Sequence, residues 1–439
     1  MKLVKLILGL AVLAVPLPPE IRAGTETEAL LRVLVRKGLL TEAEVEEVRA
    51  DMADDAAVVV TLARGPEGAA IGRLEPVAEE KSTYPPIVRP KGSRVDAVLI
   101  YGELQAQYYS LHSDQAVAAN EHLILRRARL GVRATTARHW TAEVLYNFPS
   151  QAFHKALVGW NGESVVGPLA IYAGLSKPKV GYEENFSSSA LEALERSGAT
   201  RYFVESNNGR RLAAASFRVG VYLDGNPDAA RGRQPGWYFG GALTNADRAY
   251  TAAQTASPVA GASHQIAPWG HFGYSAHWGD ARLLIGGAAG LLPDQGGLTP
   301  TPGADLMVYS AFADFRAGRM RLAGEVLGAQ MEAGRASGED AAPLGYWLQG
   351  EFEVTDPMAV VLRYSHTDSD GRGVKVSDGL RSSPAALVGD RLDELYTGFN
   401  YRLVGRDVRF QLGYVYGRVA GADEAEHVDG VRSQIQVDF

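Results

Sequence analysis

Apolar and polar residues alternate over the last nine residues of the chain. In an extended strand, one face would carry Val431, Ser433, Ile435, Val437 and Phe439. The other face would carry Arg432, Gln434, Gln436 and Asp438. One mostly apolar and one polar face suit a strand in a wall between lipid and water. A short alternating strand can also occur in a soluble domain, so the recurrence of the pattern decides its meaning.

The same period of two recurs throughout the chain from about residue 94. It predicts sixteen strands, at 95–109, 122–134, 139–149, 152–161, 168–174, 210–223, 236–245, 270–279, 281–290, 306–316, 319–331, 346–353, 358–366, 391–402, 407–418 and 431–439. Tyrosine and tryptophan near the ends of the apolar faces are typical of a membrane-interface girdle.

The connections between these segments alternate in length over the second half of the chain. Short turns are expected at 279–280, 317–318, 355–357 and 404–406, and longer loops at 291–305, 332–345, 367–390 and 419–430. Soluble β-sandwiches would explain the alternation but not short turns at one end and long loops at the other. We therefore predict an all-β fold, in which residues 94–439 form a 16-stranded antiparallel transmembrane β-barrel.

The N-terminus has the features of a secretory signal. Lys2 and Lys5 precede an apolar run from Leu6 to Val15, which is short for a membrane span, and small Ala23 suits cleavage. Residues 1–23 are thus predicted to be a signal peptide, with a membrane anchor as the alternative. With an even number of strands, both barrel ends lie on the short-turn, periplasmic side, and the expected location is the outer membrane of a Gram-negative-type bacterium.

A short helical segment is predicted between the signal and the barrel. Thr25 with Glu28, and Thr41 with Glu44, have the spacing of capping boxes, and Gly38 can end the first helix. Residues 24–64 are expected to form a periplasmic helical hairpin, which serves as a spacer or contacts another component of the envelope. The proline-rich residues 65–93 are expected to be a linker.

Composition and motifs argue against other classes of protein. Cys 0 excludes disulfides and thiolate ligands, and a net charge of −7 gives no reason to expect nucleic-acid binding. No phosphate-binding loop or His-Glu-x-x-His motif occurs, and His271 and His277 would lie about 20 Å apart on a strand, too far to share a metal. We therefore expect no enzyme activity, no catalytic or metal-binding residue and no cofactor.

Arginines dominate the polar faces of the predicted strands. Arg127, Arg129 and Arg133 share one face, opposite Ile124, Leu130 and Val132, and the same parity directs others inward: Arg218, Arg321, Arg363, Arg402, Arg409 and Arg432. Guanidinium groups lining a narrow passage attract anions. Alternatively, these arginines are neutralised across the lumen by carboxylates, for which the candidates are Asp314, Glu325, Glu351, Glu353 and Glu394.

Several stretches also resemble one known family. Leu125–Val132 (LRRARLGV), Trp140 and Tyr146-Asn-Phe148 are similar to the second and third strands of the phosphate-selective porin O and P family. Gly174–Ser189 is similar to the start of its long third loop, and Leu392–Phe439 to its closing hairpin. The resemblance covers about 94–439 and implies a 16-stranded barrel, commonly a homotrimer, whose third loop folds inward to narrow the pore.

The chain departs from that family in its lysines. Members that select phosphate carry many pore lysines, whereas this barrel region has only Lys155, Lys177, Lys179 and Lys375. Any basic lining must therefore come from arginine.

Residues 176–209 are the expected constriction loop. Its candidate site residues are Lys177, Lys179, Glu183, Glu184, Glu192, Glu195 and Arg196. We expect a short helix from Ser187 to Arg196, with acidic groups facing the wall arginines. The alternative is an ordinary surface helix with solvated charges.

The sequence therefore predicts an outer-membrane porin, a passive channel for small hydrophilic solutes with an anion (phosphate-like) preference as the further expectation. The expected partners are membrane lipid, small anions or other solutes, and two further copies of the chain. Two other functions remain open: a structural tether of the outer membrane, and a sheath for a periplasmic electron-transfer partner.

Overall fold

The computed structural model describes residues 95–439 except 116–118, 137, 166, 187, 206, 249–264, 385, 406 and 422–423. The predicted signal peptide, helical hairpin and linker lie outside the described residues. No helix in the described part of the chain is both long and apolar enough to cross a membrane.

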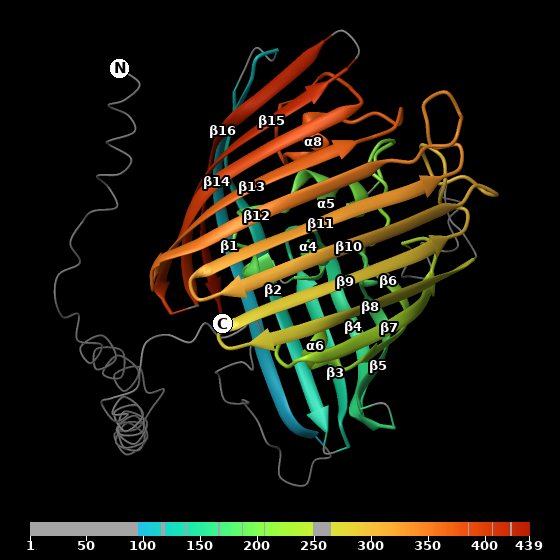
Figure 1. Cartoon of the computed structure of the whole chain (residues 1–439), viewed down its shortest axis with the longest axis vertical. Coiled ribbons are helices and arrows are strands. Elements are labelled where there is room, and N and C mark those ends of the chain that lie inside the picture. The colour runs from blue at the N-terminus through green and yellow to red at the C-terminus, as the bar shows by residue number, and fades with distance from the viewer. Residues whose placement is uncertain are drawn as a thin grey trace, which may run out of the picture. The chain divides into compact units, whose positions relative to one another are not determined.

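Sixteen antiparallel strands form one closed barrel, in which each strand pairs with its neighbours in sequence and β1 pairs with β16 (Figure 1). The strands are β1 (Val95–Ser113), β2 (Asn120–Thr136), β3 (Trp140–Asn147), β4 (Ala152–Ser164), β5 (Gly167–Ser176), β6 (Arg218–Gly225), β7 (Gly236–Asn245), β8 (Ile266–Trp278), β9 (Ala281–Leu292), β10 (Leu306–Ala317), β11 (Met320–Met331), β12 (Leu344–Thr355), β13 (Met358–Asp368), β14 (Arg391–Val404), β15 (Val408–Ala420) and β16 (Ala425–Asp438). The predicted fold class and strand number are confirmed.

The barrel closes between the first and last strands. Pairing runs from Glu103 opposite Asp438 to Ser113 opposite Val428. The backbone of Phe439 extends the ladder, because Gly102 N–H donates to its carbonyl at 2.7 Å. A Cβ on Gly102 would lie 2.3 Å from the Phe439 ring, so glycine is required where the terminal ring crosses β1. Closure leaves the sheet without a free edge.

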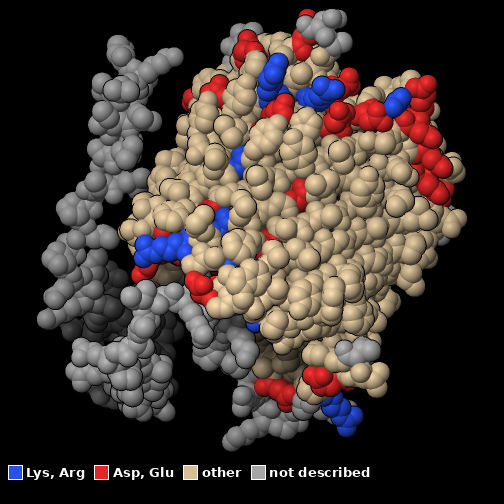
Figure 2. Space-filling view, in the orientation of Figure 1, with Lys and Arg blue, Asp and Glu red and all other residues tan. Residues whose placement is uncertain are grey.

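The two faces of the wall differ as the alternation predicts. Large apolar side chains such as Leu362, Leu243 and Phe272 are exposed outward, whereas Gln434, Gln436 and similar polar groups are buried inside. Figure 2 shows a broad surface of uncharged side chains, with most charged ones toward the rims. An apolar outer band of this kind suits hydrocarbon.

Three connections fold inward and carry the helices. The loop between β5 and β6 contains α4 (Tyr182–Asn185), a 3₁₀ turn (Ser188–Ala190) and α5 (Gly198–Val204). The turn between β6 and β7 contains α6 (Pro227–Ala230), and the loop between β13 and β14 contains α8 (Val376–Gly379). The buried core therefore lies inside the barrel, where the residues of α5 pack beside Val374, Val376 and Leu380.

Some predicted boundaries are wrong. β6 begins at Arg218 rather than residue 210, because residues 210–217 still belong to the inward loop. β16 begins at Ala425, so the connection after β15 is short and the expected long loop 419–430 is not formed. In both places contacts with neighbouring segments, which alternation does not encode, set the boundary.

A β-bulge changes which residues of β2 face inward. Gln105 pairs with Arg127 but Ala106 pairs with Leu125, so Arg126 has no partner of its own in the ladder. The bulge reverses the parity of the residues before it. Ile124 therefore packs against the inner core, contrary to the prediction, and Arg126 and Arg127 both point inward.

Candidate pore and its constriction

The third loop is anchored first on the wall formed by β10 and β11. Gly181 N–H donates to Ser310 Oγ at 3.3 Å, and the Tyr182 hydroxyl donates to Asp314 at 2.6 Å. The Tyr182 ring stacks on Phe312 with 3.9 Å between centroids. The loop is therefore fastened to the strands opposite its own origin, as an inward constriction requires.

Four acidic residues of the loop help to hold it in place. Each has a basic partner: Glu183 with Arg363 (2.9 Å), Glu184 with Arg196 (2.9 Å) and Lys177, Glu192 with Arg409 (3.5 Å), and Glu195 with Arg126 (2.5 Å). Burial alone would raise the pKa of Glu184, but Arg196 and Lys177 outweigh burial and hold that pKa below its ordinary value. The expected row of free carboxylates facing an arginine wall is therefore not formed.

The helix of this loop lies later than predicted. Residues 188–190 make only one 3₁₀ turn, and the α-helix covers Gly198–Val204. Ser197 caps that helix by accepting the N–H of Thr200, and the Glu183 carboxylate accepts both the N–H and the hydroxyl of Ser197. Residues 191–196 lie between the 3₁₀ turn and the α-helix, and in this segment Glu192 contacts Arg409 of β15 and Glu195 contacts Arg126 of β2.

The loop between β13 and β14 was not recognised as part of the lumen from the sequence. Asp378 in this loop pairs with Arg210 of the third loop at 2.6 Å and accepts from Asn208 at 2.7 Å. The Arg372 guanidinium donates to the carbonyls of Arg210, Gly297, Leu298 and Gly334, which belong to three other loops. The two inward loops therefore fill the lumen together beside β13–β16.

The inner wall formed by β2 and β4 carries several positively charged side chains. Arg129 pairs with Glu103 at 2.9 Å, while Arg133 and Lys155 share Glu143, each at 3.0 Å. Buried Arg127 donates to the Gln105 amide and has no carboxylate within ion-pair distance among the described residues. We call these side chains (Arg126, Arg127, Arg129, Arg133 and Lys155) the basic wall.

The third loop adds two more cations near the basic wall. Lys177 and Arg196 share the single carboxylate of Glu184. The charges of Arg129, Lys177, Arg127 and Arg196 all act on the ring of His154 on β4. The irregular pairing of β3 and β4 near Tyr146 brings His154 inward next to Lys155. We call Arg127, Arg129, Lys177 and Arg196, which lie around the His154 ring, the cation cluster.

Arginines elsewhere on the wall are compensated by acids or carbonyls. Direct ion pairs join Arg321 to Asp314 (2.8 Å), Arg363 to Glu394 (2.9 Å) and Arg402 to Glu353 (2.9 Å). Glu325, a carboxylate expected to neutralise an arginine, instead accepts the Tyr182 N–H and the Trp347 indole N–H. Arg218 is 1% exposed and donates to the carbonyls of Ala213, Ser216 and Ala246, and Arg432 donates to the Gln107 amide. Pairing of this kind was the alternative that the sequence left open.

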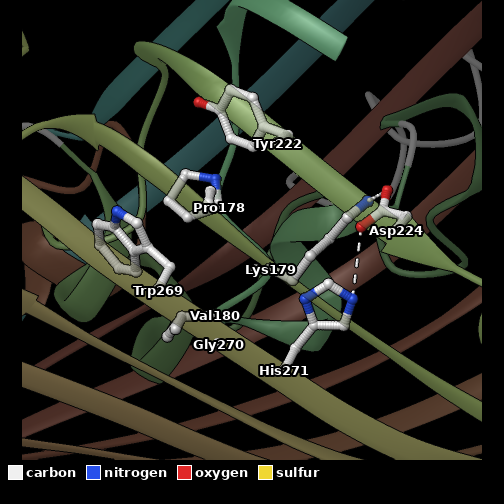
Figure 3. Close-up of a pocket in the computed structure, with 10 residues that line it drawn as sticks. Pro178, Lys179, Val180, Tyr222, Asp224, Trp269, Gly270 and His271 are labelled. Atoms are coloured by element: carbon white, nitrogen blue, oxygen red, sulfur yellow. Dashed lines mark ion pairs between the residues drawn. The ribbon is translucent and has the colours of Figure 1, made fainter. Parts of the chain in front are cut away.

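A small pocket lies under the first residues of the third loop, between them and β6–β8 (Figure 3). Asp224 is its charged centre, with Lys179 at 3.6 Å, His271 at 3.4 Å and the Tyr172 hydroxyl at 3.0 Å. Lys179 thus ties the start of the loop to the wall through Asp224.

Comparison with known proteins agrees with this architecture. The phosphate-selective porin O and P family model matches residues 98–439. The anion-selective porin from Comamonas acidovorans is 14% identical, with a TM-score of 0.55 over 78% of this chain and 99% of that chain. Salmonella typhi OmpF in complex with daunomycin is 11% identical, with a TM-score of 0.51 over 78% and 98%. No curated protein matches the chain significantly.

A closed antiparallel barrel with an apolar outer band and an inward third loop is the architecture of outer-membrane porins. The family match extends over most of the chain and includes the whole third loop. The chain belongs to the phosphate-selective porin O and P family.

Proposed function

We propose that this channel prefers anions and that they pass along the basic wall, between β2–β4 and the third loop. The cation cluster carries the proposal, because it gathers the positive charges of several side chains around one point of the passage, beside the partly exposed Arg133 and Lys155. Lys155 and Arg133 keep 30% and 32% of their side chains exposed, so they are accessible to a passing ion. Water is scarce in a constriction, and each charge there acts with little screening.

The similar protein from Comamonas acidovorans is described as anion-selective, which supports the same preference here. The passage would admit small hydrophilic solutes, with phosphate-like anions among them. From the sequence we further propose that the protein forms a homotrimer, carries an N-terminal signal peptide and has periplasmic helices before the barrel.

Reversal potentials in a KCl gradient across a planar bilayer test the anion preference. Arg129→Gln with Lys155→Gln removes two positive charges from the basic wall and leaves Arg133 to hold Glu143. We expect the reversal potential to show that the anion-to-cation permeability ratio falls several-fold. The reason is that one unit charge at contact distance contributes about 1 kcal/mol in water and more in a narrow pore. Arg391→Gln, which removes a rim charge that is 66% exposed, is the matched control.

An unchanged potential in the double variant would refute the proposed route. A wild-type protein that inserts but conducts no ions would favour the structural alternatives, a membrane tether or a sheath around an electron-transfer partner.

A further inference from the structure

Two partly exposed aromatic rings lie within the cation cluster. The ring of Phe217, just before β6, lies 4.8 Å from the His154 ring, with 36° between their planes. The Lys177 ammonium lies 4.5 Å from the centre of the Phe217 ring. Neither ring is fully buried. An apolar surface is therefore presented beside cations in a passage otherwise lined by polar groups.

Several other inward aromatic residues are held by the protein or fully buried, whereas Phe217 is only partly buried. Tyr182 is stacked on Phe312, and Tyr202 and Phe203 of α5 are completely buried. Trp269 donates its indole N–H to Thr244 at 3.0 Å. Phe217 instead extends from the loop into the cluster, where leaving apolar surface in water has a free-energy cost unless a ligand covers it.

We propose that the cation cluster and Phe217 together recognise aromatic carboxylates. The carboxylate would be held among Lys177, Arg129 and Arg196, and the ring of the ligand would lie against Phe217 and His154. Charged hydrogen bonds orient the carboxylate, and offset or edge-on ring contacts add stabilisation that an inorganic anion cannot gain. This assignment rests on the proposed anion preference and names the substrate class that the same passage would favour.

Concentration-dependent block of single-channel KCl current by benzoate and by acetate tests the assignment. We expect benzoate to bind the wild-type channel more tightly than acetate. Phe217→Leu should weaken benzoate binding about threefold to tenfold, the factor that one aromatic contact contributes, and leave acetate binding unchanged. Phe217→Tyr keeps the ring and should retain the benzoate preference.

Phe352→Leu, on the outer face of β12, is the matched control and should behave as wild type. Heat-modifiable migration in gels confirms that each variant is folded. Equal affinity for benzoate and acetate in an anion-selective wild-type channel would overturn this inference alone, as would unchanged benzoate binding in Phe217→Leu. A wild-type channel without anion selectivity would overturn the proposed function as well.

Discussion

Arg126 and Glu195 meet in a two-point ion pair, with 2.5 Å between Nε and Oε1 and 2.8 Å between Nη2 and Oε2. The pair joins β2 to the part of the third loop just before α5, and both side chains are largely buried. The strong neighbouring charge of Arg126 holds the pKa of Glu195 well below its ordinary value, although burial opposes this. The loop is therefore latched to the basic wall as well as to the opposite strands.

Breaking this latch should loosen the loop. Arg126→Gln leaves the Glu195 charge with Arg381 as its nearest direct partner, and loss of one member of a buried pair costs about 3 kcal/mol. We expect larger and noisier single-channel conductance. Arg126→Gln combined with Glu195→Gln should recover part of the loss, and additive effects in the double variant would show that the pair is not coupled.

Anion preference should fall as pH rises from 7 to 9. Burial lowers the pKa of Lys177 to about 8, with Glu184 partly offsetting this shift. A lysine is charged below its pKa and neutral above it, so the cation cluster loses one positive charge within this range. The measurement is the reversal potential in a KCl gradient at each pH.

Lys177→Arg keeps the charge throughout this range and should abolish the pH dependence. If Lys177→Arg and wild type respond identically to pH, another group is responsible for the change.

Deletion of Phe439 should impair insertion. Its backbone continues the closing ladder to Gly102, and its ring covers that glycine. We expect less heat-modifiable protein in the outer membrane. Phe439→Tyr keeps the ring and should insert normally, whereas normal insertion of the deletion variant would show that the residue is dispensable.

Arg210→Gln should weaken the contact between the two inward loops. Asp378 would lose its 2.6 Å partner and keep Asn208, and Arg211 at 3.8 Å, so we expect a loss of about 1 kcal/mol in stability. Protease accessibility of the loop between β13 and β14 checks this. Equal cleavage in wild type and variant would argue that other contacts suffice.

The strands could be predicted because alternation is local: each residue of β16 reveals its face by its own polarity. Arg126 could not be placed in the same way, since the bulge depends on pairing with β1. Two consecutive arginines in an alternating strand are the one local sign of it. The helix was predicted too early because the polarity of residues 187–196 does not reveal that Ser197 is held by distant Glu183.

For the arginines, too, the sequence predicts the direction of the side chain but not its partners. Parity correctly directs Arg129, Arg321 and Arg363 inward, but their charge balance depends on residues far away in sequence, such as Glu103 and Glu394. His154 and Phe217 gave no sequence signal, because their meeting requires the third loop to return to β4.

The Arg372 guanidinium takes its acceptors from the main chain of three neighbouring loops. Main-chain carbonyls are present whatever side chain a residue carries. Loops tied in this way can exchange most of their residues during evolution without losing the contact. Insertions or deletions that move those carbonyls would be selected against instead, so length rather than residue identity should be the restrained property of these loops.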